Sequence, residues 1–184
     1  MVVNVEKLLL DFMNLIEDNQ IEIYNEFSLQ HELGIFLREN LNNYSIQFER
    51  NARFFGINNT IKHEIDIVVF NDKEKFAIEL KYPRNRQYPE QMFLFIKDIK
   101  FMEELKIMGF DKTYCLTLVD DKNFYSDSKS KTDNIIYSYF RNGNIVHGII
   151  RKPTGSKDKA INIEGNYLIK WQKCRDKKFY IVTI

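Results

Sequence analysis

The stretch HEIDIVVFNDKEKFAIELKY, residues 63 to 82, decides the fold of this 184-residue chain. Two strands are predicted here, over residues 60–70 and 75–82, because apolar residues alternate at Ile61, Ile65 and Ile67 and then become continuous, and the second segment has the same pattern. The linker NDKEK between them is short and polar, so we expect the strands to pair antiparallel. Nearly continuous apolar runs are typical of strands buried on both faces. A charged residue inside such a strand needs a partner or a function.

Three charged residues stand inside this strand pair. Asp66 lies between two isoleucines, and Glu79 and Lys81 lie two positions apart on the next strand, where they point to the same face. Two carboxylates and an ammonium group are costly to bury together unless a cation neutralises the acids, and oxygen ligands suit Mg²⁺. The alternative is a solvent-exposed strand face that carries Glu79 and Lys81, with Asp66 as a solitary edge residue.

Elements on both sides of the pair extend the prediction. Apolar residues at helical spacing predict three helices, with Ser28 as the cap of the second and Pro89 near the first turn of the third. Two further apolar segments predict strands. The expected helices cover residues 5–18, 29–41 and about 89–108, and the expected strands cover 45–50 and 113–120.

The last third of the chain has a different pattern. Residues 122–134 are polar and predict a loop. This part predicts β-hairpins: IIYSYF and IVHGII are joined by Arg141-Asn142-Gly143-Asn144, and NYLIKW and KFYIVTI follow. We therefore expect one α/β domain over residues 1–184, with a mixed β-sheet flanked by helices, a core of order αβββαβ over about 28–119, and a C-terminal β-hairpin extension over about 135–184.

The segments HEIDIVVF and FAIELKY resemble the PD-(D/E)-x-K nuclease superfamily, whose members have a restriction-endonuclease-like fold. The resemblance extends to the element order over residues 28 to 119. It implies that Asp66, Glu79 and Lys81 are catalytic, that Mg²⁺ or Mn²⁺ binds Asp66, Glu79 and the carbonyl of Leu80, and that Lys81 orients or deprotonates the attacking water. Ile65 stands where the often-absent proline of the motif would be.

The same resemblance suggests further site residues. Glu32 matches a helix position that supplies an extra acidic metal ligand in many of these enzymes, although a surface glutamate is an equal alternative. Gln91 matches a glutamine of some families, but Phe95 stands where a tyrosine would complete that pattern. Basic residues near the motif and in the later loop are candidates for phosphate contacts, with solvated turns as the alternative. The candidates for contact with nucleic acid are Arg84, Arg86, Gln91, Arg151 and Lys152.

Charge and composition bear on the partner and the compartment. Residues 1–80 hold 7 basic and 14 acidic side chains, a net charge of −7, whereas residues 81–184 hold 20 and 12, a net charge of +8. The second half is therefore the expected footprint for a polyanion. No stretch is long and apolar enough to span a membrane, so we expect no membrane partner. Two cysteines without nearby metal-ligand partners favour buried free thiols and a cytoplasmic setting.

These observations predict a Mg²⁺-dependent nuclease that hydrolyses phosphodiester bonds, and the first interpretation is a DNA endonuclease of the restriction, repair or recombination type. A homodimer is the expected form for cutting both strands. Two alternatives stay open: a catalytically inactive module of the same fold that binds nucleic acid or protein, and a nuclease that acts on RNA or single strands.

Overall fold

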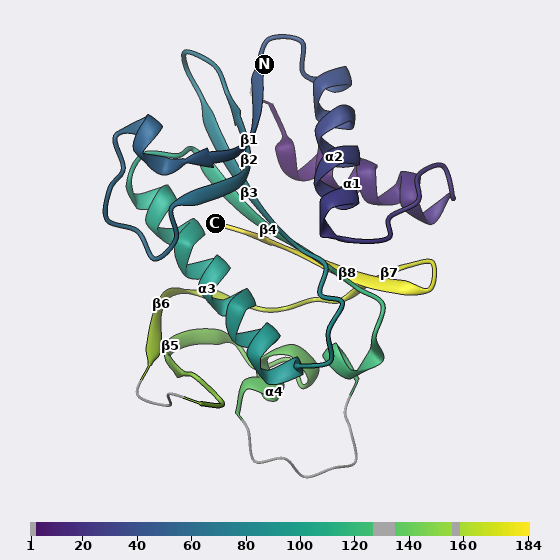
Figure 1. Ribbon diagram of the computed structural model, residues 1–184, viewed down its shortest axis with the longest axis vertical. Helices are drawn as coiled ribbons and strands as arrows, with labels where there is room; N and C mark the ends of the chain where they lie inside the picture. The colour runs from purple at the N-terminus through teal and green to yellow at the C-terminus, as the bar shows by residue number, and fades with distance from the viewer. Residues whose placement is uncertain (1–2, 127–134, 156–158) are drawn as a thin grey trace.

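The computed structural model describes residues 3–126, 135–155 and 159–184. Its centre is a six-stranded mixed sheet of order β1-β2-β3-β4-β8-β7, in which only β3 and β4 run parallel, and β5 and β6 form a separate two-stranded sheet (Figure 1). The elements are α1 (Val5–Glu17), α2 (Glu26–Asn40), β1 (Ser45–Asn51), η1 (Ala52–Phe55), β2 (Glu64–Phe70), β3 (Lys75–Lys81), α3 (Tyr88–Ile107), β4 (Lys112–Val119), η2 (Lys122–Phe124), α4 (Ile136–Arg141), β5 (Val146–Arg151), β6 (Ala160–Tyr167), β7 (Gln172–Cys174) and β8 (Lys177–Thr183).

The α/β class and the order α2-β1-β2-β3-α3-β4 are confirmed. The strands predicted from the motif pair antiparallel, with Ile67 opposite Ile78. Helix α3 is the crossover that makes β4 parallel to β3, as a connection between parallel strands requires. No helix within the described ranges is long and apolar enough to cross a membrane.

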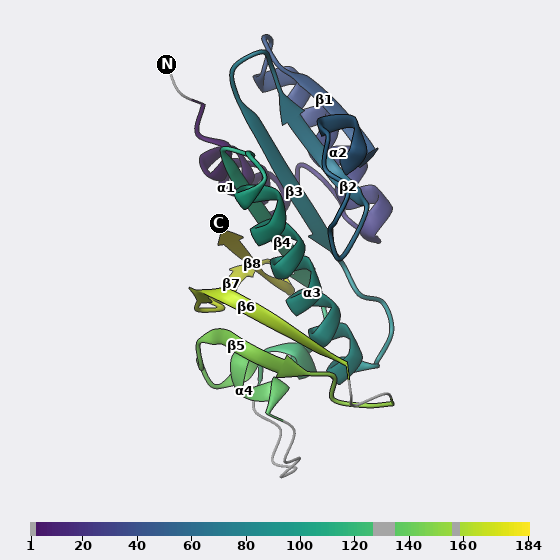
Figure 2. The same ribbon diagram turned by 90° about the vertical axis from the view of Figure 1, so that its left-hand side faces the viewer.

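The sheet separates two apolar cores. Helices α1 and α2 cover one face, where Ile67, Ile78 and Leu80 lie among the buried residues. Helix α3 and the β5-β6 hairpin cover the other face, where Val68 and Ala77 contribute (Figures 1 and 2). This double coverage explains the nearly continuous apolar runs of β2 and β3.

Helix α2 begins three residues earlier than predicted. Its N-cap is Asn25, and Ser28 is the third residue of a capping box in which each side chain accepts a hydrogen bond from the other's backbone amide. Gly34 lets the helix approach β1, because a Cβ at this position would lie 2.2 Å from the ring of Phe48. The earlier start brings Glu26 into the first turn, beside the end of β3.

The prediction for the C-terminal part was wrong in two places. Residues 136–141 form helix α4 rather than a strand, because Ile136 and Phe140, four positions apart, are both buried and thus share one helical face. The last hairpin, β7-β8, is not an extension, since β8 pairs antiparallel with β4 and completes the central sheet. The strand expected at IVHGII is present as β5, but because residues 136–141 are helical its partner is β6 instead. In the predicted loop 122–134, residues 122–124 form η2, whereas 127–134 lie outside the described residues.

Candidate active site

The structure brings Asp66, Glu79 and Lys81 together at the end of β3. The carboxylate of Asp66 accepts a hydrogen bond from the backbone amide of Leu80 at 2.7 Å. Glu79 and Lys81 face α3, whereas Leu80, which stands between them in β3, packs in the opposite core. Glu79 is almost completely buried, and one of its oxygens lies 3.4 Å from the backbone nitrogen of Asp66. Asp66 and Lys81 are half-buried.

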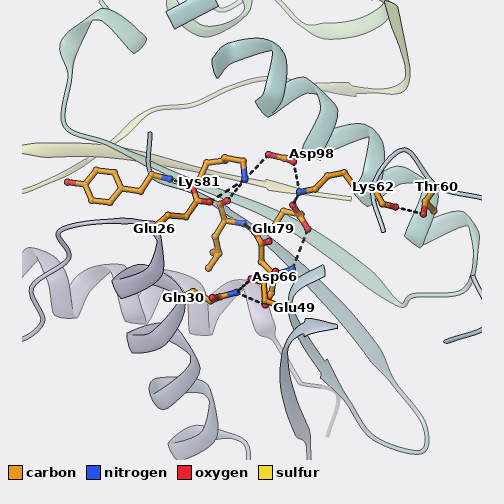
Figure 3. A network of polar contacts seen from close by, with 11 residues as sticks. Glu26, Gln30, Glu49, Thr60, Lys62, Asp66, Glu79, Lys81 and Asp98 are labelled. Atoms are coloured by element: carbon orange, nitrogen blue, oxygen red, sulfur yellow. Dashed lines mark hydrogen bonds and ion pairs between the residues drawn. The ribbon is translucent and has the colours of Figure 1, made fainter. Parts of the chain in front are cut away.

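Two residues that the sequence did not single out complete the cluster (Figure 3). Asp98 comes from the buried face of α3, with one carboxylate oxygen 2.9 Å from the ammonium of Lys62 and the other 3.5 Å from that of Lys81. Lys62 comes from the loop before β2 and also pairs with Glu79. Three acids and two lysines therefore meet in one buried network, and its acids outnumber its lysines.

Helix α2 supplies a fourth acid, Glu26, at the rim. One of its oxygens lies 3.6 Å from the ammonium of Lys81, and the other accepts the backbone amide of Tyr82 at 2.9 Å. One turn later the side-chain amide of Gln30 donates to the carbonyl of Asp66 at 2.9 Å and to Glu49 at 2.6 Å. Glu26 and Gln30 share a helical face because they are four residues apart.

Glu49 marks a backbone irregularity beside the site. It lies in β1 with a φ of 48°, in the left-handed region that non-glycine residues rarely adopt. Its neighbours Phe48 and Arg50 pair with Ile67 and Ile65, so it stands beside Asp66 on the next strand. Positive-φ backbone of this kind costs stability and is concentrated at functional sites.

Two adjoining pockets open onto Asp66. One, of about 210 Å³, is lined by Glu26, Phe27, Gln30, Glu49, Asp66 and Leu80. The other, of about 530 Å³, lies toward Lys62, His63 and Lys97. A ligand can therefore reach the carboxylate of Asp66 from an acidic side and from a side that also carries basic groups.

Burial disfavours the charged forms of the two acids Asp66 and Glu79. Burial raises the pKa of Asp66 to about 6, although Lys81 and Lys62 act against this shift. Burial, together with the charges of Asp66 and Asp98, raises the pKa of Glu79 well above its usual range. Burial tends to lower the pKa of Lys81, but Asp98 and Glu26 outweigh it and hold this pKa above its usual value. An additional cation would stabilise both acids in their charged form.

The donor chemistry fits a hard divalent cation. Asp66, Glu79 and the carbonyl of Leu80 offer oxygen atoms only, and Mg²⁺ typically takes one or two carboxylates and keeps several waters. Across residues 3–126, 135–155 and 159–184, no three His, Cys, Asp or Glu side chains are grouped closely enough to hold an ion. Two of these donors already contact lysines, since Lys62 pairs with Glu79 and Lys81 donates to the carbonyl of Leu80 at 2.9 Å.

Other predicted site residues lie elsewhere. Glu32 does not reach the cluster: it is two residues beyond Gln30, which turns it about 200° around the helix, and its carboxylate lies 3.4 Å from His31. The helical acid at the site is Glu26 instead. Gln91 lies in the first turn of α3, about two turns before Asp98, which is the residue that α3 contributes.

The basic candidates are spread over the surface. Arg84 follows the motif, but its guanidinium pairs with Asp120 at 2.6 Å. Arg86 is exposed in the same segment. Arg151 and Lys152 lie at the end of β5, on the separate hairpin. Cys115 and Cys174 are buried free thiols, as predicted.

No family model, no curated protein and no solved structure matches this chain.

Proposed function

We propose that the chain is a Mg²⁺-dependent nuclease of the PD-(D/E)-x-K type, with a restriction-endonuclease-like core and DNA as its substrate. The observation that carries this proposal is the meeting of Asp66, Glu79 and Lys81 beside a pocket. The element order α2-β1-β2-β3-α3-β4 supports it, because this is the order that the sequence resemblance implies. The burial of acids that lack enough counter-charge argues against an inactive module, since such groups destabilise a fold that does not use them.

Asp66, Glu79 and the carbonyl of Leu80 would hold the ion, Mg²⁺ or Mn²⁺, and Glu26 would take the role that the resemblance implies for Glu32. When bound, the cation would polarise the phosphodiester and lower the pKa of a nearby water. Gln30 fixes the backbone of Asp66 through its carbonyl, and the amide of Leu80 fixes the carboxylate. These contacts orient the ligands before substrate arrives.

Lys81 acts as a positive charge beside the scissile phosphate. The acids around it raise its pKa, so its ammonium is protonated at neutral pH. It can then donate hydrogen bonds to a phosphate oxygen or to the attacking water, which fits the water-orienting role that the resemblance implies for Lys81. Asp98 and Glu26, on either side of the ammonium, position it.

Single-stranded nucleic acid is a second candidate substrate, and the exposed ring of Phe27 favours it. This side chain is 71% exposed and lines the same pocket as Asp66. The other α2 side chains of that wall, Glu26 and Gln30, are polar, and the ring of Phe27 stacks with that of His31 at a centroid distance of 6.3 Å. Bases of a single strand stack on such rings, with about 1–3 kcal/mol for each stacked base.

A cleavage assay tests both candidates. Supercoiled plasmid, linear duplex and single-stranded oligonucleotides are incubated with Mg²⁺, with Mn²⁺ and with a chelator. We expect metal-dependent cleavage of at least one substrate, lost in Asp66→Ala. If Phe27 binds an unpaired base, Phe27→Ala should weaken cleavage of the single strand more than that of the duplex. Metal-independent cleavage, or equal activity in Asp66→Ala, would contradict the proposed function.

A further inference from the structure

Lys62 is the least expected member of the cluster. It belongs to no strand or helix, yet its side chain is only 21% exposed and its ammonium pairs with Glu79 and with Asp98, the latter at 2.9 Å (Figure 3). The ring of Phe101 lies 5.6 Å from the same ammonium. A lysine is ordered so deep in a site only where its charge is needed, because burial disfavours the ammonium form.

The acids that Lys62 joins have few other partners. Among the described residues, the carboxylate of Glu79 has one hydrogen-bond contact besides Lys62: one of its oxygens lies 3.4 Å from the backbone nitrogen of Asp66. The second oxygen of Asp98 is buried without a hydrogen bond and faces Lys81 at 3.5 Å. Lys62 is thus the closest positive charge to a carboxylate that also belongs to the proposed metal site.

Many nucleases bind two divalent cations about 3.5–4 Å apart, bridged by shared carboxylates. A second ion here would need the far oxygen of Glu79 together with Asp98, and both groups already bind Lys62. We propose that Lys62 is a built-in counter-ion that takes the place of a second metal, so that the site binds one divalent cation. This inference rests on the proposed function.

Lys100 shows what a purely structural lysine looks like in the same protein. It also lies between two acids, Glu103 at 3.4 Å and Glu164 at 3.6 Å, and its side chain is 17% exposed. Glu103, however, accepts backbone amides from Glu164 and Gly165 at 3.2 and 2.6 Å. Removing Lys100 therefore leaves an acid that is still hydrogen-bonded, whereas removing Lys62 leaves Glu79 and Asp98 able to bind another cation.

The test counts bound ions in the full chain by electron paramagnetic resonance with Mn²⁺, and measures thermal unfolding with and without that ion. Wild type should bind one Mn²⁺. Lys62→Met should bind two and should unfold at a lower temperature without metal, with much of this loss recovered when Mn²⁺ is added. Lys100→Met, the matched control, should bind one ion and gain no more from Mn²⁺ than wild type does. Lys62→Arg keeps the charge and should bind one.

Two ions in wild type, or one in a folded Lys62→Met, would overturn the inference and leave the proposed function intact. No bound ion in wild type would instead overturn the proposed function and the inference with it. If Lys62→Met does not fold even with Mn²⁺, the metal has failed to replace the lysine, which also counts against the inference. The ion counts of wild type and Lys62→Arg then still decide whether the site binds one ion.

Discussion

Helix α3 buries two acids, Asp98 and Glu103, and the two are held in opposite ways. Each is 4% exposed. Glu103 accepts the backbone amides of Glu164 and Gly165 and, at 3.1 Å, the hydroxyl of Tyr167, so donors fixed by strand β6 surround it. Among the described residues, the partners of the Asp98 carboxylate are the ammonium groups of Lys62 and Lys81, and no backbone amide donates to it.

The difference separates an acid that holds the fold from one that serves a site. Backbone amides cannot leave without disrupting a strand, so the Glu103 cluster joins the β5-β6 hairpin to α3 permanently. Lysine side chains rotate, and they can exchange a carboxylate for a phosphate oxygen when substrate or metal arrives. A buried acid with only movable partners is therefore the better marker of function.

The largest expected effect is on cleavage. Asp66→Ala and Lys81→Ala should each lower activity by at least about a hundredfold, since removal of one charged group at a reacting phosphate has an effect of this size. Glu103→Gln should keep the specific activity of wild type at a temperature where it stays folded. Initial rates on labelled substrate at saturating Mg²⁺ measure both. An equal loss in Glu103→Gln would erase the distinction between the two clusters.

The sequence alone predicted the site residues that lie in the strand pair of the motif. Asp66, Glu79 and Lys81 stand in a strand pair whose apolar pattern identifies it, so their convergence follows from pairing and alternation. Asp98 had a usable signal: it lies three residues after Phe95 and four before Met102, which places an acid on the apolar stripe of α3.

Lys62 and Glu26 could not be identified in the same way. Lys62 reaches the cluster from a loop, and no periodicity records the direction of a loop side chain. With Ser28 as the predicted helix cap, Glu26 falls before the first turn of the helix. The true cap, Asn25, starts the helix earlier and places Glu26 and Gln30 on the face toward Asp66. The expected acid, Glu32, was implied by the sequence resemblance and not by the position of the cap.

The second prediction concerns stability, with opposite signs at the two clusters. Glu103→Ala should lower the free energy of unfolding by about 3 kcal/mol, because it leaves buried donors without an acceptor. Asp66→Asn in metal-free protein should raise it by about 1 kcal/mol at pH 8. The pKa of Asp66 is raised to about 6, above its usual value. Its ionised form therefore destabilises the folded state, and stability is lost as the pH rises through 6.

Urea unfolding at pH 5 and pH 8, with a chelator present, measures these changes. The gain from Asp66→Asn should be smaller at pH 5, where most of the native carboxyl is already protonated, than at pH 8. A destabilised Asp66→Asn at pH 8 would mean that its hydrogen bond from Leu80 outweighs its burial. The site would then resemble the Glu103 cluster.

The smallest expected effect distinguishes two glutamates of helix α2. Glu26 lies at the rim of the site, with its carboxylate near Lys81 and on the wall of the smaller pocket, whereas Glu32 points away toward His31. Glu26→Gln keeps an oxygen for the amide of Tyr82 but removes a charge beside the proposed ion. We expect it to need about fivefold more Mg²⁺ for half-maximal cleavage, the effect of about 1 kcal/mol from one partly screened charge.

Glu32→Gln, its matched control on the same helix, should leave the Mg²⁺ dependence unchanged. Both variants should unfold at nearly the wild-type temperature without metal, since a partly exposed helical glutamate contributes little to folding. A raised Mg²⁺ requirement in Glu32→Gln alone would show that α2 turns its other face to the metal in solution, and would return the acidic ligand to the position that the sequence resemblance implied.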